Sequence, residues 1–206
     1  MLGLHTHQPA GQETTLPTVS NTMTCPGCGE SVSMDMNICA YCRRKITFTS
    51  VKDVRGMSAT DSMKFLRAYK DALATNPNHP AVQMSLGLMQ FDRGDYANAL
   101  SAFDAAVSHG SDDPETYFYR AVSRFRATKP IHIKVTEAKE LLELLDIAIS
   151  MNPLPQYNYV KAYLIRRLIE KKGIAYRETS SDAMAAARAE HLSDADIADM
   201  DALLTT

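Results

Sequence analysis

The sequence of 206 residues has no tryptophan, only four cysteines, and no apolar run near the roughly 18 residues that cross a membrane. Its 22 basic and 24 acidic residues give a net charge of -2, so no general attraction to nucleic acid or anionic lipid is expected. It also lacks the glycine-rich phosphate loop, the H-E-x-x-H motif and the G-x-S-x-G motif. We therefore expect a non-catalytic protein that does not enter a membrane.

The four cysteines form two close pairs, C-P-G-C at Cys25 and Cys28 and C-A-Y-C at Cys39 and Cys42. Two intervening residues let backbone N–H groups point at the sulfurs while both thiolates of a pair face one point. Two such turns together make a tetrahedral four-thiolate site, which is typical of structural zinc. We predict that these four cysteines bind one structural zinc ion.

Two other interpretations of the cysteines are weaker. The N-terminus has no secretory pattern, so we expect a cytoplasmic protein, and in a reducing compartment paired C-x-x-C motifs bind metal rather than form disulfides. A single-iron site of the rubredoxin kind uses the same turns, but the ten residues between the pairs match the short loop of a zinc ribbon better. A closed four-sulfur site has no open coordination position, so its role would be structural.

The composition divides the N-terminal part of the chain into two segments. Residues 1–22 are rich in Thr, Gln, Pro and Gly and are predicted to be disordered. Residues 23–55 are predicted to form the zinc ribbon, with a strand at Ile46–Val51 because this run alternates and is β-branched. A compact ribbon beginning at Met23 also suggests the hypothesis that Met23 is the natural start.

Residues 60–206 show a helical pattern that repeats. Pro80 and Pro114 lie 34 residues apart, each at a position that opens a helix, and the same step relates the small residues Gly87 and Ala121. A period of 34 with paired helices is the spacing of a tetratricopeptide solenoid. The helices that we expect cover residues 60–75, 80–93, 96–109, 114–127, 136–150, 156–171, 181–191 and 194–204.

The residues themselves resemble the tetratricopeptide repeat (TPR) family. Those that carry the resemblance are Leu86, Gly87, Gly94, Asp95, Tyr96, Ala99, Phe103 and Ala106. The sequence departs from the family where Gln90 and Arg124 occupy positions that usually hold an aromatic residue, and the resemblance covers residues 60–172. It implies a mostly α fold: a short TPR-like solenoid of helical hairpins behind a small N-terminal β zinc ribbon, with the last two helices as a terminal cap.

The resemblance also implies a partner-binding groove on the inner face of the solenoid. The residues expected to line it are Met84, Leu88, Phe91, Phe118, Val122 and Phe125. Because this face is apolar, it favours an amphipathic helix of a protein partner over a C-terminal carboxylate. The alternative is that the C-terminal helices, or a second copy of the chain, cover it.

These inferences lead to a non-catalytic adaptor that binds a protein or peptide partner through the groove. The alternative function is a nucleic-acid-associated factor that docks through the ribbon, where Arg43, Arg44 and Lys45 follow the last cysteine. Direct nucleic-acid binding is disfavoured there, because the ribbon has few aromatic residues for base stacking and a short charged run is usually a solvated face.

Overall fold

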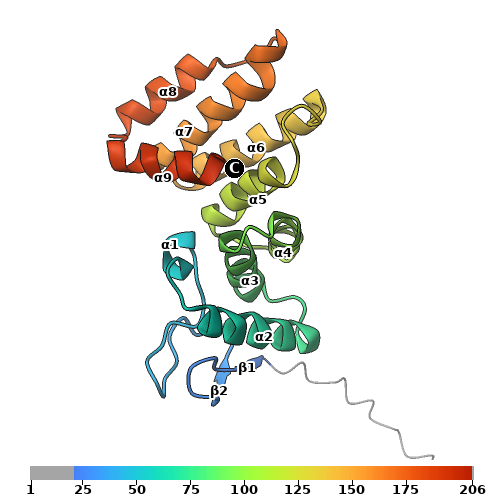
Figure 1. The fold of residues 1–206 in the computed structure, drawn as a ribbon, viewed down its shortest axis with the longest axis vertical. Helices are drawn as coiled ribbons and strands as arrows, with labels where there is room; N and C mark the ends of the chain where they lie inside the picture. Colours follow the sequence, from blue (N-terminus) through green and yellow to red (C-terminus); the bar gives the residue numbers. More distant parts are fainter. Residues whose placement is uncertain (1–20, 206) are drawn as a thin grey trace, which may run out of the picture.

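The computed structural model describes residues 21–205, so the predicted disorder of residues 1–20 lies outside the described residues. The described chain is mostly α-helical with one small antiparallel sheet near its N-terminal end, as the sequence predicts (Figure 1). Its α-helices are α1 (Val51–Val54), α2 (Ala59–Thr75), α3 (Pro80–Asp92), α4 (Tyr96–Ser108), α5 (Pro114–Ala127), α6 (Val135–Met151), α7 (Pro155–Leu164), α8 (Ser180–Ala189) and α9 (Asp194–Leu204).

The sheet pairs β1 (Thr22–Thr24) with β2 (Ser31–Ser33), in a register that places Met23 opposite Val32. The prediction of disorder is therefore wrong for Thr22. Met23 and Val32 are both buried on the same face, and the first cysteine pair lies in the turn between the strands. The second cysteine pair lies in a loop closed by the isolated bridge from Ile38 to Lys45.

The strand predicted at Ile46–Val51 does not form, and Val51 instead begins α1. Ile46 and Phe48 are buried, and so is Thr47 between them; the Ile46 N–H donates to the Asn37 carbonyl within the ribbon at 2.8 Å, whereas helices supply partners for the Ile46 carbonyl and for Phe48. The Tyr69 hydroxyl donates to the Ile46 carbonyl at 2.7 Å, and the Phe48 N–H donates to the Ser85 hydroxyl at 2.8 Å. Beyond Ile46, side-chain hydroxyls of α2 and α3 therefore take the place of a neighbouring strand.

The ribbon packs on the first helices and shares one continuous hydrophobic core with them. The rings of Phe48 and Phe65 have centroids 5.2 Å apart, which joins the ribbon to α2. At the edge of this contact, Asp35 lies 3.0 Å from Nε2 of His79, the residue that caps α3. The ribbon thus covers the open end of the helical array, and Figure 1 shows it beneath α2.

Helices α3 to α6 follow one another as antiparallel neighbours, and each packs against the next (Figure 1). The close approach of α3 and α4 depends on Gly87, because a Cβ there would lie 2.7 Å from the ring of Phe103. The boundaries of α3, α4 and α5 agree with the expected ones to within one residue, since proline at the first turn and aspartate or histidine caps mark them locally.

The helix that begins as α7 changes its winding at its C-terminal end. It continues as the π-helical segment η1 (Ile165–Ile169) and the 3-10 turn η2 (Glu170–Lys172), and it stops at Gly173 with a φ of 66°. Helix α8 then packs antiparallel against α7, and α9 crosses back over α7 toward α5 (Figure 1). Within residues 21–205 no helix combines the length and the apolar character needed to cross a membrane.

Candidate metal centre and partner-binding surfaces

The two cysteine pairs form turns of the same construction. In the first, the N–H of Gly29 donates to the Cys25 carbonyl at 3.0 Å; in the second, the N–H of Arg43 donates to the Cys39 carbonyl at 3.0 Å. The residue after each pair has a left-handed backbone, with φ of 83° at Gly29 and 60° at Arg43. This matched hydrogen bonding turns the thiols of both pairs toward a common point.

The four sulfur atoms lie within 4.8 Å of one another. Sγ of Cys25 is 3.7 Å from Sγ of Cys42, and Sγ of Cys28 is 3.7 Å from Sγ of Cys39. A tetrahedral site with metal–sulfur bonds of about 2.3 Å requires sulfur separations of about 3.8 Å, whereas a disulfide requires about 2.05 Å. All four cysteines are free, so the geometry fits a bound metal ion and not a pair of disulfides.

The surroundings of the thiols also suit a metal. Backbone N–H donation from Cys42 lowers the pKa of the Cys39 thiol to about 6, whereas, despite a backbone hydrogen bond at Glu30, burial and the neighbouring thiols raise the pKa of Cys28, so Cys39 is the thiol that ionises more readily. Cys25 and Cys39 are buried while Cys28 and Cys42 are exposed, so the site lies at the surface with its inner half against the core. Gly27 leaves room beside it, since a Cβ there would lie 3.1 Å from Sγ of Cys42.

The six residues predicted to line an inner groove are brought together, but they are buried within the chain. Their side chains are 0–4% exposed: Met84, Leu88, Phe91, Phe118, Val122 and Phe125. An open groove with these residues as its floor is therefore not present, and the alternative that the chain itself covers this face describes the structure. Periodicity identifies residues that share a face but not the segment that packs on it.

Two segments close this inner face. Helix α1 packs on α3, and the Val51 N–H donates to the Tyr119 hydroxyl of α5 at 3.1 Å. Helix α9 packs on α5 and α7 through its buried residues Met200, Leu203 and Leu204. The two segments are tied to each other, because Nζ of Lys52 lies 2.7 Å from the Asp199 carboxylate. The inner face is thus filled from both ends of the chain.

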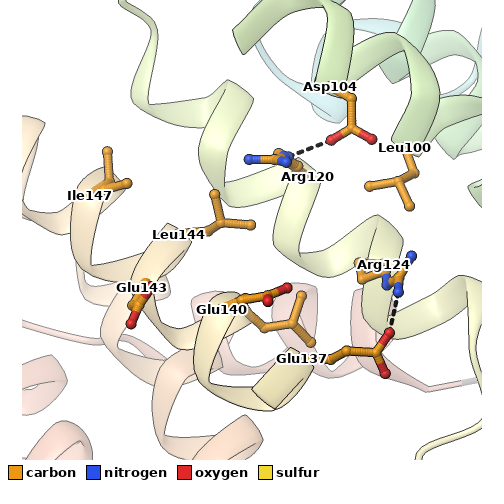
Figure 2. Close-up of a pocket in the computed structure, with 10 residues that line it drawn as sticks. Leu100, Asp104, Arg120, Arg124, Glu137, Glu140, Glu143, Leu144 and Ile147 are labelled. Atoms are coloured by element: carbon orange, nitrogen blue, oxygen red, sulfur yellow. Dashed lines mark hydrogen bonds and ion pairs between the residues drawn. The ribbon is translucent and has the colours of Figure 1, made fainter. Parts of the chain in front are cut away.

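A groove remains open on the outer side, over α5 between α4 and α6, with a volume of about 380 Å³ (Figure 2). Leu100, Leu144 and Ile147 line it, and Ile147 is 40% exposed. Charged residues surround these apolar side chains, and Figure 2 shows the ion pairs of Arg120 with Asp104 and of Arg124 with Glu137. This outer groove was not anticipated from the sequence.

Two carboxylates of the outer groove, Glu140 and Glu143, are exposed and have no ion pair within residues 21–205. Both arginines that line the groove are already paired. The free charge at the groove is therefore negative, beside an apolar floor.

The basic run of the ribbon is partly neutralised by the chain. Arg44 lies 3.4 Å from the Asp61 carboxylate, and Lys45 lies 2.8 Å from that of Asp53. Arg43 alone of the three has no ion pair among the described residues. The sequence contained both acids, but only the fold brings them to the run.

Two ionisable groups, one buried and one partly buried, were also not predicted from the sequence. Lys161 is 6% exposed and joins α7 to Asp146 of α6 at 2.6 Å and to Glu178. Glu115 accepts a hydrogen bond from the Tyr157 hydroxyl at 3.0 Å, and burial raises its pKa to about 7. Nothing in the sequence distinguished either residue from the other charged residues of its helix.

No family model matches this chain, and neither a curated protein nor a solved structure shows significant similarity to it. The site is therefore interpreted from its own geometry. That geometry comprises a cluster of four thiols that could hold a metal ion, a closed inner face and an open outer groove.

Proposed function

We propose that this protein is a non-catalytic adaptor, in which one zinc ion organises an N-terminal ribbon and a short TPR-like array holds a protein partner. Four thiols at tetrahedral spacing support zinc, and a site made of reduced thiols is suited to the cytoplasm. Cys25, Cys28, Cys39 and Cys42 would hold the ion, and the ion would supply folding free energy to a ribbon too small to fold alone.

The observation that carries the adaptor function is the outer groove over α5. Its apolar residues Leu144 and Ile147 are accessible, and Glu140 and Glu143 provide negative charge that no group of the described chain neutralises. The partner that fits is an amphipathic helix with apolar side chains on one face and lysine or arginine beside them. This surface replaces the predicted inner groove, which the chain fills by itself.

Metal analysis of the protein purified from its native cells tests the ribbon. We expect one zinc per chain and loss of the metal in the Cys39→Ser variant. Iron in its place would contradict a zinc ribbon, and a chain without bound metal would contradict any metal centre.

The docking groove is tested by photo-crosslinking from position 147 in native cells, followed by identification of the crosslinked segment. A Leu144→Glu/Ile147→Glu variant should lose the partner while keeping its helical circular dichroism, because both side chains are accessible. Ile131→Glu/Met151→Glu is the matched control, since these residues are exposed outside the groove. Equal capture by both variants, or a crosslinked segment without basic residues, would contradict the proposed groove.

A further inference from the structure

A second charged surface lies at the C-terminal end of the molecule, where three adjoining hollows run along α7 and η1. Tyr163 lines all three, and the hollows have volumes of about 440, 500 and 220 Å³. The cations that line them are Arg126, Lys129, Arg166, Arg167, Lys171 and Arg188, and we call this set the C-terminal basic face.

None of these six cations forms an ion pair within the part of the chain that the structure describes. In the ribbon, by contrast, Arg44 and Lys45 are both paired with carboxylates. Among the described residues, none of those that line the three hollows carries a carboxylate. Arg126 is held by the Leu203 carbonyl and by the ring of Tyr96, so the other cations of this set carry most of the free positive charge on this face.

One carboxylate that interacts with these cations, Glu170, also binds the start of α8. Glu170 accepts hydrogen bonds from the backbone N–H and the hydroxyl of Ser180, both at 2.7 Å. These bonds, reinforced by the charge of Arg166, lower its pKa. Glu170 therefore holds the start of α8 and stays ionised, so it offsets part of the charge of Arg166 and leaves Arg167 and Lys171 without an ion pair among the described residues.

The winding of η1 presents the cations outward. Ile165, Leu168 and Ile169 are buried, whereas Arg166 and Arg167 are exposed on the opposite side of this π-helical turn. Arg166 lines the hollow beside α8, Arg167 lines the hollow beside the end of α5, and both line the small hollow between them. Such π-helical turns are frequent at functional sites.

The ring of Tyr163 lies between these cations. It is partly exposed, and it packs edge-on against Phe125 with ring centroids 6.0 Å apart, which holds it in place. A fixed aromatic ring with arginines on both sides offers a stacking surface next to phosphate-binding groups.

We propose that the C-terminal basic face binds single-stranded nucleic acid, with Arg166 and Arg167 on phosphates and Tyr163 against a base. The large exposed apolar residues of the described chain all lie outside the three hollows. An acidic peptide or a membrane would therefore find charge here but no apolar anchor, whereas a nucleic-acid strand needs only cations and a ring. This surface is separate from the outer groove, so either can hold without the other.

Fluorescence anisotropy of the intact zinc-loaded chain with labelled oligonucleotides of about 12 nucleotides tests the proposal. We expect Arg166→Glu/Arg167→Glu to weaken binding at least about tenfold and to lower the slope of log affinity against log salt by about 1.4, the value for two lost phosphate contacts. Arg43→Glu/Arg44→Glu on the ribbon changes the net charge equally and should leave the affinity nearly unchanged.

Stacking is tested separately with Tyr163→Phe, which should bind like the original protein, and Tyr163→Leu, which should bind about tenfold more weakly. Matched circular dichroism and thermal unfolding keep folding defects apart from binding defects. Equal loss from the two arginine pairs, loss from the ribbon pair alone, or binding of an acidic peptide but of no oligonucleotide would each overturn the proposal.

Discussion

The ribbon and the C-terminal helices close opposite ends of the same helical array, and they depend on different interactions. At the ribbon end, short strands and loops lie around four thiols, and helix hydroxyls such as that of Tyr69 satisfy the loop backbone. At the other end, α8 and α9 begin with side-chain caps at Thr179 and Ser193, and Lys161 joins three segments through ion pairs. On the proposed function, the first end depends on a metal ion from outside the chain, whereas the second depends on contacts among its own helices.

The largest expected effect is at the ribbon, where loss of the metal should unfold one end of the array and leave the other end folded. In Cys39→Ser we expect the metal to be lost and the ribbon to unfold, because metal binding supplies about 10–16 kcal/mol in zinc-finger peptides. Hydrogen exchange should show lost protection from Met23 to Phe48 and weakened protection in α2, which shares a core with the ribbon. Helices α5 to α9 should remain protected.

The exposed Tyr41 lies between the cysteines of the second pair and provides the control. Tyr41→Ser should keep both the metal and the protection of the ribbon. Complete loss of the helical circular dichroism in Cys39→Ser would show that the two ends are not independent.

The next effect concerns the C-terminal end. Lys161→Met should lower the free energy of unfolding by about 2–4 kcal/mol, since it leaves Glu178 without its cation in a partly buried site. Urea denaturation measures this loss, and adding Glu178→Gln should restore part of it. Lys139→Met, on the exposed side of α6, is the control. A loss no larger than that of the control would show that the ion pairs of Lys161 add no stability.

The sequence predicted local elements better than it predicted the surfaces that distant segments form together. Helix boundaries and the cluster of four thiols follow from local signals, such as the proline of α3 or the spacing of Cys25 and Cys28. The missing strand at Ile46–Val51 depends on hydroxyls contributed by distant helices. The closed inner face and the C-terminal basic face likewise arise from segments far apart in the chain, so no local pattern revealed them.

A smaller effect is expected at Glu115, between α1 from the ribbon side and α7 from the C-terminal side. The carboxyl of Glu115 in α5 accepts a hydrogen bond from the Tyr157 hydroxyl of α7. The positive charge of Lys52 in α1 also interacts with this carboxyl. Because burial raises its pKa from 4.5 to about 7, the folded state resists ionisation of this carboxyl. The penalty is absent below the unfolded pKa, grows as the pH rises between the two values, and is complete above about 7.

Glu115→Gln should therefore stabilise the protein by about 1–3 kcal/mol at pH 8 and have almost no effect at pH 4. Thermal unfolding over this pH range measures the difference. Glu143→Gln removes an exposed carboxyl and should give no comparable rise with pH. A stabilisation by Glu115→Gln that is the same at both pH values would contradict a pKa raised by burial.

The smallest effect compares the two turns of the metal centre. Arg43 has a φ of 60° at the position where the first turn has Gly29. A left-handed conformation costs a non-glycine residue about 1 kcal/mol, so Arg43→Gly should stabilise the metal-bound ribbon by up to that amount. Gly29→Ala should destabilise it similarly, because a Cβ there meets no atom within 4 Å and backbone strain is the only cost. Competition with a zinc chelator measures both changes. The two variants should therefore shift metal affinity in opposite directions. A shift in the same direction would show that the two turns share their hydrogen bonds but not their backbone strain.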